Sequence, residues 1–134
     1  MRIVVDTNVL ISGIFFTGAP YKILQAWKEN KFQIVFTPDI YSEYVRVAEH
    51  ISNKYPGIDI SGILNLITVH AEIIQSTTLP TQVCEDPDDD KFIACALSGK
   101  IEFIVSGDKH LLKLSGYEGI KILTPRSFYE AYLD

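Results

Sequence analysis

Ile3-Val4-Val5-Asp6-Thr7-Asn8 begins the chain with an apolar, β-branched run that ends at polar residues. An unbroken apolar run of this kind is typical of a strand buried on both faces, as in a parallel sheet covered by helices. The same order recurs where the apolar residues 101–105 lead to Ser106-Gly107-Asp108. In open parallel sheets, sites form beyond the carboxyl ends of the strands. The two runs therefore predict a parallel sheet with Asp6 and Asp108 at its carboxyl edge.

The rest of the chain alternates between expected helices and expected strands. Thr37-Pro38, Asp86-Pro87 and Thr124-Pro125 each place an N-cap side chain before a proline, which is a strong helix-start signal. The alternation predicts an α/β fold in three layers, α/β/α, with a mostly parallel central sheet. The expected helices cover residues 20–30, 38–50, 58–69, 88–98 and 125–132, and the expected strands cover residues 3–5, 32–36, 72–74, 101–105 and 120–123.

The composition indicates one globular domain over residues 1–134. The hydrophobic share of 47% is too high for a disordered chain, and no linker, repeat or charge block divides the sequence. Two cysteines, Cys84 and Cys95, are too few for a disulfide scaffold, and the apolar start is too short for a signal peptide or membrane span. We therefore expect a cytoplasmic protein without a membrane partner. A net charge of −5 argues against a nucleic-acid binder with a basic face.

Helical periodicity singles out Asp90 among the acidic residues. Projection of the expected helix 88–98 at 100° per residue places Asp90 inside the apolar arc, where a carboxylate needs a partner. Asp89 projects into the same arc, but a position near the helix N-terminus explains it locally. Asp6 and Asp108 could each cap the turn that follows instead of serving a site. Asp90 is therefore the strongest functional candidate in this run.

Glu43 lies at the margin of an apolar arc on the expected helix 38–50, and projection alone favours a solvated side chain. If it meets Asp6, Asp90 and Asp108 at the sheet edge, the carboxylates repel one another. Two unit charges about 4 Å apart repel by roughly 4 kcal/mol at an effective dielectric near 20. A hard cation relieves this repulsion, and all-oxygen ligation suits Mg²⁺ or Mn²⁺. No His or Cys constellation suits zinc.

At these residues the sequence resembles the PIN-domain family, most closely its VapC-like branch of toxin components of toxin–antitoxin systems. The matching stretches are residues 3–10, Glu43, residues 86–94 and residues 105–112. The resemblance implies a metal site made of acidic residues and polar residues that support it. The acidic residues are Asp6, Glu43, Asp90 and Asp108, and the supporting residues are Thr7, Asn8 and Ser106. Asp90 takes the family's third acidic position, with Asp89 as the other contender in the run of aspartates.

The resemblance also implies an activity and partners. It implies a homodimer that cleaves single-stranded RNA, and it changes the interpretation of Glu43 from solvated to catalytic. One or two Mg²⁺ or Mn²⁺ ions would lower the pKa of a bound water for in-line attack on phosphorus. A cognate antitoxin protein is the further partner that the toxin branch implies.

Three alternatives stay open at this stage. The chain could be an RNA-processing PIN nuclease outside a toxin–antitoxin pair, or a PIN-like binding module without activity. It could also be a phosphatase with an Asp nucleophile after the first strand. Such phosphatases carry a second Asp two residues on, and this chain has Asn8 there.

Overall fold

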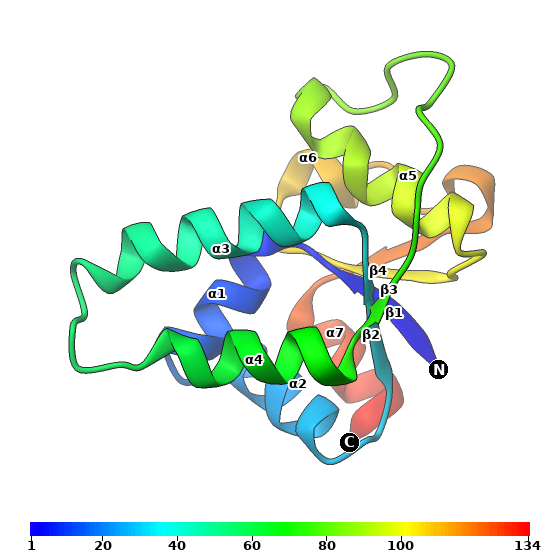
Figure 1. The fold of residues 1–134 in the computed structure, drawn as a ribbon. Coiled ribbons are helices and arrows are strands. Elements are labelled where there is room, and N and C mark those ends of the chain that lie inside the picture. The colour runs from blue at the N-terminus through cyan, green and yellow to red at the C-terminus, as the bar shows by residue number, and fades with distance from the viewer.

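The computed structural model describes all residues 1–134 and is built around a parallel sheet (Figure 1). The five strands occur in the order β3-β2-β1-β4-β5, and every neighbouring pair is parallel. The central strand is β1, whose residues Ile3, Val4 and Val5 are buried, as the apolar run predicts. The strands are β1 (Arg2–Val5), β2 (Gln33–Phe36), β3 (Glu72–Ile73), β4 (Phe103–Val105) and β5 (Lys121–Leu123).

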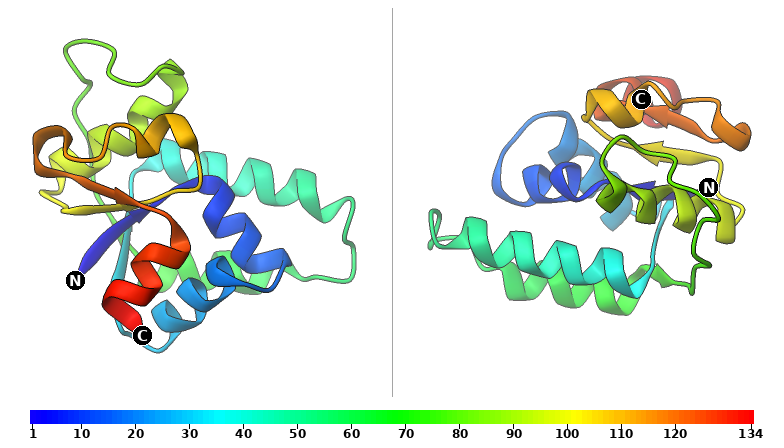
Figure 2. Two further views of the ribbon diagram at one scale, coloured as in Figure 1. Left: turned by 180° about the vertical axis from the view of Figure 1, so that it is seen from behind. Right: turned by 90° about the horizontal axis from the view of Figure 1, so that it is seen from above.

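Helices cover both faces of this sheet. The two views of Figure 2 show α3, α4 and α5 on one side and α2 with α7 on the other. The expected three-layer α/β fold with a parallel sheet is therefore confirmed. The helices are α1 (Thr7–Phe15), α2 (Ala19–Lys28), α3 (Pro38–Ser52), α4 (Ile60–His70), α5 (Asp90–Ser98), α6 (Lys109–Leu112) and α7 (Pro125–Phe128). Short 3-10 turns cover Pro87–Asp89 and Tyr117–Gly119, and the chain ends in a π-helical segment, Tyr129–Leu133.

Helix α1 is an element that the sequence analysis did not expect. It begins directly after Asp6, which occupies its N-cap position. Most of its residues are apolar and buried on more than one side, so the polar and apolar positions do not alternate with a helical period. Since α1 follows β1 without a loop, the backbone fixes where Asp6 and Thr7 lie relative to the sheet.

No single helix of this structure is long and apolar enough to span a membrane. Helices α1 and α2 reach that length and apolar composition only when taken together, across a bend of 88°.

A buried tyrosine ties α3 to the carboxyl end of β1. Tyr44 is fully buried, its ring lies 6.4 Å from that of Phe36, and its hydroxyl donates a hydrogen bond to the backbone carbonyl of Val5. The hydrogen bond satisfies a hydroxyl that would otherwise be costly to bury. Because Glu43 precedes Tyr44 on α3, this contact also holds Glu43 next to the end of β1.

Candidate functional site

An acidic pocket of about 190 Å³ lies beyond the carboxyl ends of β1 and β4. These strands are parallel neighbours, so the residues that follow them, Asp6 and Asp108, come to the same edge of the sheet. The lining contains four carboxylates and a single basic side chain, that of Arg46. The residues that line this acidic pocket are Asp6, Thr7, Asn8, Glu43, Arg46, Val47, Asp89 and Asp108.

Asp6 is the most buried of these carboxylates, with only 6% of the residue exposed. The hydroxyl of Ser106 donates a hydrogen bond of 2.6 Å to Asp6 Oδ2 and accepts one of 3.0 Å from the backbone N–H of Asp108. Burial raises the pKa of Asp6, the hydrogen bond from Ser106 opposes the shift, and the charges of Asp108 and Glu43 raise the pKa further. Ser106 therefore links Asp6 and Asp108, the aspartates that follow β1 and β4, and the charge of Asp108 contributes to the raised pKa of Asp6.

Glu43 is held in the pocket and is not a solvated helical glutamate. Its side chain is 13% exposed, and Lys91 Nζ lies 2.7 Å from its Oε1. The hydroxyl of Thr7 donates a hydrogen bond to its Oε2. Arg46, one turn along α3, lies 3.8 Å from Oε1 but is mostly exposed. Helical projection favoured solvation because it could not include Lys91 and Thr7, which come from other elements.

The structure places Asp89, and not Asp90, in the acidic pocket. The carboxylate of Asp90 accepts hydrogen bonds from the backbone N–H groups of Val83 and Cys84, the latter at 2.7 Å. A carboxylate at position 90 does have a partner, as helical projection requires, and that partner is the backbone of the preceding loop. The structure therefore does not bring Asp90 together with the other expected acidic residues, and Asp89, the other contender in this run, lies in the pocket lining with them.

The backbone geometry explains why Asp89 lines the pocket in place of Asp90. The projection assumed α-helix from residue 88, whereas Pro87–Asp89 forms a 3-10 turn and the α-helix begins only at Asp90. A 3-10 turn advances about 120° per residue instead of 100°, so side chains before Asp90 point in other directions than the projection assumed. Burial, followed by the charges of Asp6, Asp86, Asp108 and Glu43, raises the pKa of Asp89 to about 6.

Asp108 has two roles in this geometry. Its Oδ1 accepts a hydrogen bond of 2.9 Å from the backbone N–H of His110, so it caps α6. It also lines the acidic pocket. The capping interpretation and the site interpretation from the sequence are thus compatible. Asn8, by contrast, is an exposed residue of the pocket lining.

Lys91 borders the site but was not singled out from the sequence. Its ammonium contacts Glu43 and also Asp88 Oδ1, at 3.2 Å. Burial lowers the pKa of Lys91, but the hydrogen bonds and charges of these two carboxylates shift it upward on balance. No signal in helical periodicity finds this contact, because it joins α5 to α3.

The donor set of the acidic pocket suits a hard divalent cation, since its ligand atoms are carboxylate oxygens. Burial, followed by the charges of neighbouring carboxylates, raises the pKa values of Asp6 and Asp89, and a bound cation would favour their charged forms. No group of three or more Asp, Glu, His or Cys side chains is close enough to form a ready-made metal site. The carboxylates therefore fit such an ion by their chemistry and shared pocket, and they would have to approach one another to ligate it.

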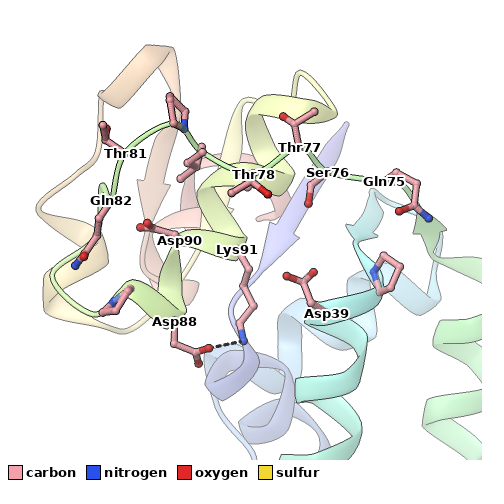
Figure 3. Close-up of a pocket in the computed structure, with 15 residues that line it drawn as sticks. Asp39, Gln75, Ser76, Thr77, Thr78, Thr81, Gln82, Asp88, Asp90 and Lys91 are labelled. Atoms are coloured by element: carbon pink, nitrogen blue, oxygen red, sulfur yellow. Dashed lines mark hydrogen bonds and ion pairs between the residues drawn. The ribbon is translucent and has the colours of Figure 1, made fainter.

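Lys91 and Asp88 line a larger pocket of about 700 Å³ (Figure 3), and Lys91 also contacts Glu43 of the acidic pocket. The loop of residues 75–82 and the beginnings of α3 and α5 line the larger pocket, mostly with hydroxyl, amide and carboxylate groups. Asp90 belongs to this lining, which agrees with its bonds to the loop. In Figure 3 the side chain of Lys91 extends from α5 toward Asp88.

Comparison with known proteins adds two findings. The family profile described as the PIN domain matches residues 2–110, a range that contains every carboxylate of the acidic pocket. The chain is also similar to the uncharacterized protein MJ1680 of Methanocaldococcus jannaschii. The two are 31% identical over an alignment 144 positions long, which covers 98% of this chain and 92% of that protein.

Proposed function

This chain belongs to the PIN-domain family, whose members are generally nucleases, and we propose that it is a Mg²⁺- or Mn²⁺-dependent endoribonuclease that cleaves single-stranded RNA. The observation that carries the proposal is the meeting of four carboxylates from separate parts of the chain in one pocket at the sheet's carboxyl edge. Their charges repel one another, which favours a function that brings a cation to them. Those carboxylates are Asp6, Glu43, Asp89 and Asp108.

Apart from Asn8, each polar residue that lines the pocket has a role in this proposal. Asp6, Asp89 and Asp108 would hold the ion, while Ser106 keeps Asp6 and the backbone of Asp108 in place. When bound, such an ion supplies a Lewis acid that activates water and stabilises the leaving oxygen of an in-line displacement. Glu43, held by Thr7, would accept a hydrogen bond from the attacking water. Arg46 is exposed at the rim and offers a contact to an RNA phosphate.

Cleavage of labelled single-stranded RNA in Mn²⁺ and in EDTA tests the proposal. We expect cleavage in Mn²⁺ only, and a loss of at least about 100-fold in Asp89→Asn, because one charged ligand is removed. Asp90→Asn is the matched control: the substitution is the same and the position adjacent, but this side chain faces the loop. It should stay within about tenfold of wild type. Full activity of Asp89→Asn, or an inactive but folded Asp90→Asn, would contradict the assignment.

We also propose that the protein acts as a homodimer and as the toxin of a toxin–antitoxin pair. Exposed aromatic side chains support a binding surface: Phe16 and Tyr55 lie with their ring centroids 5.4 Å apart. A partly apolar pocket of about 300 Å³ between α1, α2 and α4 lies in the same half of the molecule. Size measurement in solution, co-purification with the product of the adjacent reading frame and growth on overexpression test these proposals. Monomeric protein that binds no such product and leaves growth unchanged would contradict them.

A binding module without activity is the second candidate, and the lack of a ready-made three-ligand site is the observation that favours it. The same RNA experiment separates the two, because a module would leave varied single strands intact in Mn²⁺. An Asp-nucleophile phosphatase would instead form an acid-stable, hydroxylamine-sensitive phosphoenzyme at Asp6.

A further inference from the structure

Lys91 is the one lysine within ion-pair distance of an acidic-pocket carboxylate. Its Nζ lies 2.7 Å from Glu43 Oε1, and the two side chains are only 12% and 13% exposed. A pair shielded from water in this way is screened less by solvent and salt than an exposed pair. The ammonium is thus a fixed positive charge at the wall of the pocket.

The compensation of charge in the pocket is uneven. Glu43 has Lys91, a hydrogen bond from Thr7 and the distant Arg46. None of the three aspartates of the pocket forms an ion pair with a basic side chain. Arg46 adds little, because its side chain is 71% exposed and lies 3.8 Å away. The negative charge left without a partner is therefore on the aspartates.

Chain geometry couples Lys91 to the pocket. The 3-10 turn that directs Asp89 into the pocket is followed at once by α5, and the first turn of α5 carries Lys91 to Glu43. Asp88, on the outer side, contacts the same ammonium at 3.2 Å and fixes its position from the larger pocket. The same short segment thus places the Asp89 carboxylate in the pocket and the positively charged ammonium of Lys91 beside it.

We propose that Lys91 is a resident counter-ion that holds Glu43 out of the cation site and leaves that site to Asp6, Asp89 and Asp108. This inference rests on the proposed metal-dependent function. Lys91 lets the metal-free protein fold with its acidic pocket intact, and it weakens the attraction of the pocket for a divalent ion. Lys91 is a positioning residue: it acts on the reaction through Glu43.

Mn²⁺ binding by calorimetry, without RNA, and thermal unfolding in EDTA and in Mn²⁺ test this role. In Lys91→Met we expect the Kd for Mn²⁺ to fall about tenfold, because a nearby positive charge is removed. The Tm in EDTA should fall by about 4 °C, since Glu43 is left without its partner, and the gain in Tm on adding Mn²⁺ should grow. Lys91→Arg keeps the charge and should restore both values.

Two further variants separate charge from packing. Lys121→Met removes a lysine that pairs with Glu102 outside the acidic pocket, so it changes the net charge equally and should leave the Kd unchanged. The double variant Glu43→Gln, Lys91→Met removes both members of the pair. In EDTA, its Tm should be close to that of wild type. If the lower Tm of Lys91→Met came from a packing defect, the double variant would keep the low Tm. If Lys91→Met alone fails to fold, a folded double variant supports the counter-ion role, and an unfolded one overturns it.

The outcomes distinguish this inference from the function on which it rests. If wild type binds Mn²⁺ and Lys91→Met binds it equally or more weakly, Lys91 is not a counter-ion and the metal-dependent function stands. If wild type binds no Mn²⁺, the proposed function fails and the inference fails with it.

Discussion

At the scale of single residues, the three consecutive aspartates 88–90 differ in role because each side chain contacts different groups. Asp88 pairs with Lys91, Asp89 lines the acidic pocket, and Asp90 accepts backbone N–H groups of the loop. The sequence favoured Asp90 at the sheet edge, with Asp89 as the other contender, and the structure brings Asp89 to the pocket there. The sequence could not tell which one, because a change from 3-10 turn to α-helix within a few residues rotates each side chain and leaves no periodic signal.

The raised pKa of Asp89 predicts that this carboxylate destabilises the metal-free protein as pH rises. Burial and the neighbouring carboxylates raise this pKa to about 6, from an unfolded value near 3.9. The folded state therefore binds the proton more tightly, and this group's contribution to stability is fully present below about pH 4 and is lost as pH rises to about 6. In EDTA at pH 7.5 we expect Asp89→Asn to have a higher Tm than wild type, with the difference shrinking toward pH 4.

Thermal melts in EDTA from pH 4 to pH 8 check this prediction. Glu118→Gln, which neutralises an exposed carboxylate outside the pocket, is the control and should show no such pH-dependent gain. A Tm of Asp89→Asn below that of wild type at pH 7.5 would mean that the Asp89 carboxylate stabilises the metal-free fold.

At the scale of elements, two of the three helix-start signals coincide with the beginning of an α-helix, whereas Asp86-Pro87 precedes a 3-10 turn. Thr37-Pro38 and Thr124-Pro125 do precede α3 and α7. Helix α1 was missed because burial on several sides removes its amphipathic pattern, and the contact of Lys91 with Glu43 was missed because it joins two helices distant in sequence. Local signals thus determine where elements begin, while packing determines which side chains meet.

The loop of residues 74–86 depends on the hydrogen bonds that Asp90 accepts from it. Loss of this carboxylate leaves the backbone N–H groups of Val83 and Cys84 without their acceptor, at a cost of about 1–3 kcal/mol. We expect Asp90→Ala to speed hydrogen exchange at these two amides and protease cleavage in the loop. Asp90→Asn keeps one acceptor oxygen and should show a smaller effect. Unchanged exchange in Asp90→Ala would show that other contacts hold the loop.

The packing of α1 on α2 depends on a glycine. A Cβ at Gly13 would lie 2.7 Å from the backbone carbonyl oxygen of Pro20, which cannot move aside as a flexible side chain could. We expect Gly13→Ala to lower the free energy of unfolding by about 1–3 kcal/mol. Gly62→Ala in α4 is the matched control, because nothing lies within 4 Å of its Cβ. It should be neutral or add up to about 1 kcal/mol, measured by urea unfolding.

At the scale of the whole molecule, most of the net charge of −5 is concentrated in the acidic pocket. When ionised, the four carboxylates of the acidic pocket carry four of those five units, so the rest of the molecule is close to neutral. A negative net charge therefore does not mean that the whole surface repels RNA. The negative charge lies in one pocket, which repels phosphate when no cation is bound and would attract it with one bound.

This distribution of charge predicts how RNA binding depends on metal and salt. In a slow variant, Glu43→Gln, we expect a labelled single strand to bind at least about tenfold more tightly in Mn²⁺ than in EDTA, because the ion cancels most of the negative charge of the aspartates and offers phosphate a cation to contact. With few basic side chains near the pocket, only about two phosphates would be neutralised, so log K should fall with log salt at a slope near −1.4. Fluorescence anisotropy at several salt concentrations measures both quantities. Equal affinity in EDTA, or a slope several times steeper, would place the RNA on a different and basic surface, because the acidic pocket can produce neither result.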